Sequence, residues 1–230
     1  NTGLHRATQP VLAILNSDDL FHPRRLEACL DTMERTGAAI AASRIDFIDE
    51  DDRRIGNSWY DEVMGRWREI GNTSLALLNG NFLMTTSNLV LHRRVLEDVG
   101  YFRNFRYAHD LDFFVRALGG GHRIAMAEEA LLDYRYHPGN TIKESHTKVR
   151  SEWAFICACA MRHAPEPLLE TLDRWDYLDR LNQIVQTHQL TPGVLLILQA
   201  MFAAASAETP DMTFLTARPD LLERIYRSIG

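Results

Sequence analysis

The chain has 230 residues, of which 46% are hydrophobic and 24% are charged, a composition typical of a soluble globular protein. The formal net charge of −6 argues against a broad nucleic-acid surface, which would need clustered Lys and Arg side chains. An acidic protein still binds an anionic substrate where a divalent cation supplies the positive charge. The three cysteines, Cys29, Cys157 and Cys159, have no disulfide or zinc spacing and indicate a reducing compartment.

The first part of the chain has the pattern of a strand, a helix and a second strand. The apolar run at 10–15 predicts a strand covered on both faces, and 38–49 predicts the next one. Between them, Pro23 suits the first turn of a helix that Gly37 ends. The apolar residues at helical spacing are Leu26, Leu30 and Met33. This order indicates a βαβ unit and a largely parallel sheet.

The middle of the chain continues the α/β pattern. Residues 57–70 contain two tryptophans but give no clear structural pattern. The later segments predict a loop and strand at 81–93, a short helix ended by Gly100, a helix at 109–118 and one or two strands at 123–137.

After about residue 142, apolar residues at helical spacing predict a series of helices. We therefore expect an α/β domain at 1–142 and a helical extension at 143–230. The longest apolar run, from Gly193, is interrupted by Gln199 and falls short of the ~20 residues that a bilayer span needs. The sequence thus predicts no membrane-spanning helix, and it leaves open a peripheral membrane contact and a homodimer formed through the extension.

Polar side chains follow the first predicted strand directly. Asn16, Ser17, Asp18 and Asp19 stand where this strand ends and the chain turns toward the next helix. In open α/β sheets ligands bind outside the carboxyl ends of the strands, and hard oxygen ligands suit Mg²⁺ or Mn²⁺. A cap or a turn is the competing interpretation, and the acidic pair taken alone favours it.

Two later clusters carry further ionisable side chains. Asp110 begins the predicted helix at 109–118, while Asp112 and Arg116 are four residues apart and so predict an ion pair on its surface. Asp110 has no such partner in the sequence, so it either caps the helix or faces a cleft. His137 ends the segment at 123–137 and, taken alone, is a surface or hydrogen-bonded His.

Taken in series, these clusters resemble the inverting family 2 glycosyltransferases, which have the GT-A fold. The resemblance covers residues 1–142 and rests on four segments in the family's order: LNSDDLFHPRRLE, DVGYFRN, HDLDFFVRA and YRYHPGN. Asn16 stands in place of the family's usual first Asp, and His109 in place of its usual Glu. The opening NTGLHRATQP is similar to the segment before the family's D-x-D strand, so we expect this sequence to lack the N-terminal nucleotide-binding segment.

The resemblance implies both a fold and an activity. The expected fold is α/β, with a mixed, mainly parallel sheet flanked by helices and a C-terminal helical extension. The expected enzyme is a metal-dependent inverting hexosyltransferase that moves a sugar from a nucleotide-sugar, namely a UDP-sugar, to an acceptor hydroxyl. The acceptor would be a glycan or lipid-linked, in cell-surface polysaccharide or glycan synthesis, and the enzyme would be cytoplasmic, at the inner face of the membrane.

The resemblance also assigns roles to individual residues. Asp110 holds the family's position for the general base. The metal ion, Mn²⁺ or Mg²⁺, would be bound by Asp18, Asp19 and His137, with Asp18 as the first choice for a direct ligand and Asp19 assisting. The residues expected to contact substrate are Asn16, Asp18, Asp19, Thr85, Thr86, His109 and Arg135.

Two other functions would use the same residues. A catalytically inactive relative that serves as a binding or scaffold module would account for Asn16 and His109. A metal-dependent phosphatase would explain the carboxylates, but it leaves the Y-R-x-H segment without a role. Metal-dependent nucleotide binding separates the enzyme from the scaffold.

Overall fold

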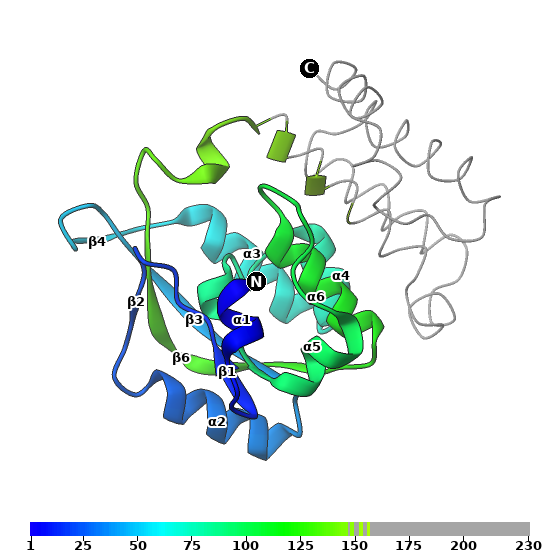
Figure 1. Cartoon of the computed structure of the whole chain (residues 1–230). Coiled ribbons are helices and arrows are strands. Elements are labelled where there is room, and N and C mark those ends of the chain that lie inside the picture. The colour runs from blue at the N-terminus through cyan, green and yellow to red at the C-terminus, as the bar shows by residue number, and fades with distance from the viewer. Residues whose placement is uncertain (147, 150–151, 154–155, 157–230) are drawn as a thin grey trace, which may run out of the picture. The chain divides into compact units, whose positions relative to one another are not determined.

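The computed structural model describes residues 1–146, 148–149, 152–153 and 156 (Figure 1). The chain divides into two compact units, one of Asn1–Asn104 and His109–Asn140, the other of Phe105–Ala108 and the chain from Thr141 onward. Most of the predicted helical extension lies outside the described residues, and the domain boundary expected after residue 142 stays a prediction. No helix in the described part of the chain is both long enough and apolar enough to cross a bilayer.

The first unit is built on a six-stranded sheet with helices on both faces. The strands are β1 Val11–Ala13, β2 Leu20–Phe21, β3 Ile40–Ile48, β4 Arg54–Ile55, β5 Val90–His92 and β6 Ile124–Arg135. Their order is β1-β5-β3-β6-β2, and β4 pairs with β3. The helices of this unit are α1 Thr2–Arg6, α2 Arg25–Thr36, α3 Ser58–Ile70, α4 Thr73–Asn79, α5 Arg93–Val99 and α6 His109–Gly119, with the 3₁₀ turn η1 Thr86–Asn88. Figure 1 shows α2 on one face of the sheet and α3, α4 and α6 on the other.

The mixed sheet flanked by helices confirms the predicted fold class, but the prediction that this sheet is mainly parallel was wrong. Among the described strands β3 and β6 form a parallel pair, whereas β1–β5, β3–β5, β2–β6 and β3–β4 are antiparallel. The βαβ unit is present, since β1 and β3 run in the same direction. However, β5 lies between them and runs antiparallel to both, which the sequence order of strand, helix and strand could not reveal.

Strand β1 is also less covered than its apolar sequence predicts. Leu12 is buried, but Ala13 is exposed and the Leu15 side chain that follows is 49% exposed. Among the described strands β1 pairs with β5 alone, so it lies at an edge of the sheet. The exposure of Ala13 and Leu15 shows that the expectation of cover on both faces was wrong.

Helix α2 ends at Gly37 as predicted, because Gly37 adopts the left-handed conformation with φ of 67°. The helix buries a different face from the one that its apolar residues predict. Leu26 and Leu30 are 46% and 44% exposed, whereas Arg25 is fully buried. The Arg25 guanidinium donates to the Asn88 side-chain oxygen at 2.9 Å and to the Ser43 hydroxyl. This polar anchor in the core fixes the rotation of the helix, and apolar spacing alone gives no sign of it.

Most other elements follow the sequence. Strand β5, the helices α5 and α6 and the single strand β6 occupy the predicted segments, and Gly100 ends α5. The segment without a predicted structure forms α3. Its signals were the flanking residues: the Asn57 side chain caps the helix by accepting from the Tyr60 N–H at 3.0 Å, and Gly71 ends it with φ of 65°.

Candidate functional site

The acidic turn after β1 is organised around Asp19. This carboxylate is buried and accepts hydrogen bonds from the Ser87 hydroxyl at 2.6 Å and the Arg135 backbone N–H at 3.0 Å. Burial raises the pKa of Asp19, and the hydrogen bonds from Ser87 and Arg135 oppose that rise. Asp19 thus ties together three segments that are far apart in sequence: the turn after β1, η1 and the end of β6.

Asn16 occupies the position of the family's first Asp, and its uncharged amide suits this place. Its Nδ2 donates to the Thr85 hydroxyl oxygen at 3.0 Å and lies 3.4 Å from the Asp19 carboxylate. Its Oδ1 accepts from the Thr86 hydroxyl at 3.1 Å. An Asp here would place a second negative charge beside Asp19 and would have no N–H to donate. Thr85 and Thr86, predicted to contact substrate, are buried and bond to Asn16.

Asp18 has different surroundings from Asp19. Its carboxylate lies 3.3 Å from His137 Nε2, and the two side chains are 41% and 25% exposed. His137 Nδ1 accepts the Gly139 N–H at 3.1 Å, so the ring hydrogen belongs on Nε2, facing Asp18. Asn140 holds the turn by accepting the His137 N–H through its side-chain oxygen at 2.5 Å.

Arg135, predicted as a substrate contact, binds the protein through its guanidinium. Nε donates to the Asp18 carbonyl oxygen at 2.9 Å, Nη1 to the Asp49 carbonyl oxygen at 2.7 Å and Nη2 to the Asp52 carboxylate at 2.5 Å. Together with its backbone N–H on Asp19, these contacts fix the acidic turn against the loop between β3 and β4. We interpret Arg135 as a residue that positions Asp18.

Asp110 lies at the start of α6 and is 6% exposed. Its Oδ1 accepts the Leu111 N–H at 2.7 Å, and its Oδ2 accepts the Asn81 side-chain N–H at 3.0 Å. Burial raises the pKa of Asp110, while the neighbouring His109 and these hydrogen bonds lower it.

Two residues after Asp110, Asp112 forms the predicted ion pair with Arg116, with 2.9 Å between Oδ2 and Nε.

The two acidic clusters have neighbours in common. Burial raises the pKa of the Tyr134 phenol on β6, and the charges of Asp19, Asp110 and Asp18 raise it further. The segment at 81–88 also contacts both clusters, through Asn81 on Asp110 and through Ser87 on Asp19. The sequence did not single out Asn81 and Ser87, although polar residues interrupt an apolar stretch in this segment.

The residues at Asp18 fit a divalent cation only in part. Within the described residues no group of three His, Cys, Asp or Glu side chains converges as a metal cluster. Asp18 and His137 nevertheless place a carboxylate oxygen beside an imidazole nitrogen, donors that suit Mn²⁺ or Mg²⁺. Ligation by His137 Nε2 requires its hydrogen to move to Nδ1, and the Gly139 N–H then has to turn away. Asp19 already uses both oxygens for protein donors.

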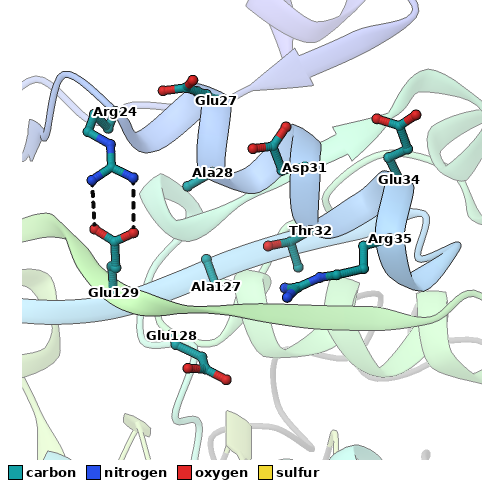
Figure 2. Close-up of a pocket in the computed structure, with 10 residues that line it drawn as sticks. All are labelled: Arg24, Glu27, Ala28, Asp31, Thr32, Glu34, Arg35, Ala127, Glu128 and Glu129. Carbon is teal, nitrogen blue, oxygen red and sulfur yellow. Dashed lines mark hydrogen bonds and ion pairs between the residues drawn. The ribbon is translucent and has the colours of Figure 1, made fainter.

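A separate hollow of about 710 Å³ lies between α2 and β6 (Figure 2). Its lining is mostly charged, and Arg24 and Glu129 pair across it with two hydrogen bonds of 3.3 and 3.2 Å. These two side chains are 60% and 53% exposed, so their pairing adds little to stability. None of the predicted site residues lines this hollow.

Solved structures share the fold of this chain at low sequence identity. The chain superposes on residues 1–349 of S. aureus TarS in complex with UDP-GlcNAc with a TM-score of 0.53 and 15% identity, covering 82% of this chain and 51% of that one. For S. aureus TarS in a longer form the TM-score is 0.52 at 16% identity, covering 82% of this chain and 30% of that one. The chain thus spans about half the length of the shorter TarS chain. The likeness shows a GT-A-like fold.

The family follows from the sequence comparison. The sequence model of the family described as glycosyl transferase family group 2 matches residues 11–213 of this chain. The chain belongs to this family, which confirms the resemblance drawn from its four motifs. A comparison with curated proteins gave no match.

Proposed function

We propose that this chain belongs to an inverting glycosyltransferase that moves a sugar from a nucleotide-sugar, specifically a UDP-sugar, to an acceptor hydroxyl. The observation that carries the proposal is that one segment, residues 81–88, contacts both acidic clusters, through Asn81 on Asp110 at 3.0 Å and through Ser87 on Asp19 at 2.6 Å. Family membership supports it, and a similar fold was solved with UDP-GlcNAc bound. The donor and acceptor sides of the reaction would then lie within one small region.

On the donor side, Asp18 and His137 are the residues that would hold Mn²⁺ or Mg²⁺. When bound, such a cation offsets the negative charge that builds on the diphosphate leaving group. Arg135 holds the Asp18 backbone in place, because its N–H binds the Asp19 carboxylate at 3.0 Å and its Nε binds the Asp18 carbonyl oxygen at 2.9 Å.

We assign Asn16 to the support of this turn, since its amide binds Thr85 and Thr86.

On the acceptor side, Asp110 is the general base. The acceptor oxygen forms a bond to the anomeric carbon while the bond from that carbon to the diphosphate oxygen breaks, and the electron pair leaves with the nucleotide. The hydroxyl proton passes to Asp110. Because burial raises the pKa of Asp110, this carboxylate is a stronger base than an exposed one. Attack from the side opposite to the leaving group inverts the anomeric centre.

The finer expectations from the sequence remain predictions. These are a glycan or lipid-linked acceptor, a role in cell-surface polysaccharide synthesis, a place at the inner face of the membrane and a homodimer. Their support is the resemblance of the motifs to the family, and no contact among the described residues bears on them.

Replacing Asp110 by Asn tests the proposal. In the whole protein, Asp110→Asn should lower turnover of the UDP-sugar by roughly 10²–10⁴-fold, the usual contribution of a general base, while UDP still binds in the presence of Mn²⁺. UDP release reports turnover and calorimetry reports binding. Near-normal turnover in Asp110→Asn would remove the base assignment. Wild-type protein that binds no UDP with or without Mn²⁺ would instead favour the scaffold.

A further inference from the structure

Asn81 joins the candidate base to the segment that supports the acidic turn. Its side-chain Oδ1 accepts the Met84 N–H at 3.3 Å, and its backbone carbonyl oxygen accepts the same N–H at 3.1 Å. Met84 has φ of 66°, a left-handed conformation that is uncommon for a residue with a side chain. Since Oδ1 faces this N–H donor, Nδ2 is the atom that faces Asp110.

We propose that Asn81 is a positioning residue for the general base, fixing the direction of the Asp110 carboxylate through the 3.0 Å hydrogen bond from Nδ2 to Oδ2. The inference rests on the proposed function, in which Asp110 takes the proton of the acceptor hydroxyl. It adds a residue that the family motifs in this sequence do not contain.

The contacts of Asp110 show why an anchor on Oδ2 matters. Oδ1 is held by the Leu111 N–H at 2.7 Å, a contact within the first turn of α6. With this contact alone the carboxylate could turn about its own bond to the chain. The Asn81 N–H on the second oxygen stops that rotation, and each oxygen keeps a lone pair for the acceptor hydroxyl. Misplacement of a reacting group by about 1 Å can cost on the order of a hundredfold in rate.

The charges around Asp110 give the proposal an electrostatic readout. Two titratable groups that interact with Asp110 are His109 of α6 and Tyr134 of β6. His109 and the Asn81 N–H favour the ionised carboxylate, whereas burial disfavours it. Loss of the Asn81 donor therefore raises the pKa of Asp110. A base must be deprotonated to act, so the acid limb of the pH–rate profile moves to higher pH.

The decisive variant is Asn81→Asp in the whole protein. The new side chain is isosteric and keeps an oxygen for the Met84 N–H, so the turn at 81–84 retains its cap. It replaces the donor to Asp110 with a second carboxylate. We expect kcat for the UDP-sugar to fall by about ten- to a hundredfold with a donor KM within about twofold of wild type. The acid limb should also move up by about one pH unit or more, as like charges in contact require.

The matched control is Asn57→Asp, the same substitution at the N-cap of α3. Asp and Asn serve equally well as N-caps, so this variant should keep the wild-type kcat and pH profile. If Asn81→Asp does not fold, Asn81→Ser takes its place, because its short side chain cannot span the distance to Asp110.

Titration of the Asp110 carboxyl by ¹³C NMR separates the two claims. Retained turnover in Asp110→Asn would end the base assignment, but the titration would still test the contact with Asn81. A higher Asp110 pKa together with a shifted profile supports the proposal. Reduced turnover with an unchanged Asp110 titration would mean that Asn81 has a purely structural role, and it would overturn the proposal, as would a wild-type profile in Asn81→Asp.

Discussion

Asp18 and Asp19 are neighbours in the chain, yet the structure gives them opposite surroundings. Asp19 is 4% exposed, and its two oxygens accept hydrogen bonds from Ser87 at 2.6 Å and Arg135 at 3.0 Å. The Asp18 side chain is 41% exposed and lies 3.3 Å from the His137 imidazole. The Asp19 carboxylate ties the turn to η1 and to the end of β6, whereas the half-exposed Asp18 carboxylate beside an imidazole has room for a ligand. These two neighbouring Asp residues thus differ in exposure and in hydrogen-bond partners, and the proposed function gives them different roles.

The largest expected effect tests the chemical half of this comparison. Asp18→Asn removes the negative charge that would attract a cation, so Mn²⁺-dependent UDP binding should weaken by more than about a hundredfold, beyond what supporting residues of a metal site usually cost. The free energy of unfolding should change little, because the side chain is half exposed. Calorimetry with UDP, with and without Mn²⁺, measures the binding. Unchanged Mn²⁺-dependent binding would mean that Asp18 is not the metal ligand.

Asp19→Asn tests the structural half and should give a smaller effect. An amide has one acceptor oxygen, so the variant cannot accept from both Ser87 and the Arg135 N–H as the carboxylate does. We expect the free energy of unfolding to fall by about 1–3 kcal/mol, the cost of a buried donor left without its acceptor. Urea denaturation measures it, with Asp18→Asn as the matched control. If the two variants had equal free energies of unfolding, Asp18 and Asp19 would not differ in their contribution to stability.

The sequence predicted most of the fold because local signals determine most of its elements. Gly37 and Gly100 end their helices as expected, and β1, β3, β5 and β6 fall on predicted segments, whereas the two-residue strands β2 and β4 were not predicted. The failures have a common cause, which is that tertiary contacts decide them. Arg25 sets the rotation of α2 through Asn88, 63 residues away in sequence, and β5 enters the sheet between β1 and β3. No local pattern carries either fact.

The residues of the candidate site were predictable from the sequence, but the different surroundings of Asp18 and Asp19 were not. The motifs pointed to Asp18, Asp110 and His137, and the structure places Asp18 3.3 Å from His137 and joins the Asp19 and Asp110 clusters through the segment 81–88. The separation of Asp18 from Asp19 depends on partners 68 and 116 residues distant from Asp19. Asn81 was missed for the same reason, since its contact with Asp110 spans 29 residues.

Asp110 is a second buried carboxylate, and its pH dependence sharpens the comparison further. Burial raises its pKa above the ordinary value of 3.8. Between that value and its pKa in the folded chain, the folded state keeps a proton that the unfolded state has released. The free energy of unfolding of the wild type therefore falls as pH rises through this window. A buried carboxylate whose pKa is raised, such as Asp110, thus lowers the stability of the fold at neutral pH.

Asp110→Asn removes this ionisation, and its effect on the pH dependence of the free energy of unfolding is the smallest effect that we expect. The stability of the variant relative to wild type should increase with pH across the window, by about 1.4 kcal/mol for each unit by which the folded-state pKa exceeds the unfolded one. Lost hydrogen bonds add an offset but do not alter this slope, since they do not titrate. Urea denaturation of both proteins over a series of pH values measures it. A difference that stays flat with pH would show that Asp110 ionises in the folded chain as it does in the unfolded one, and its burial would then contribute nothing to its strength as a base.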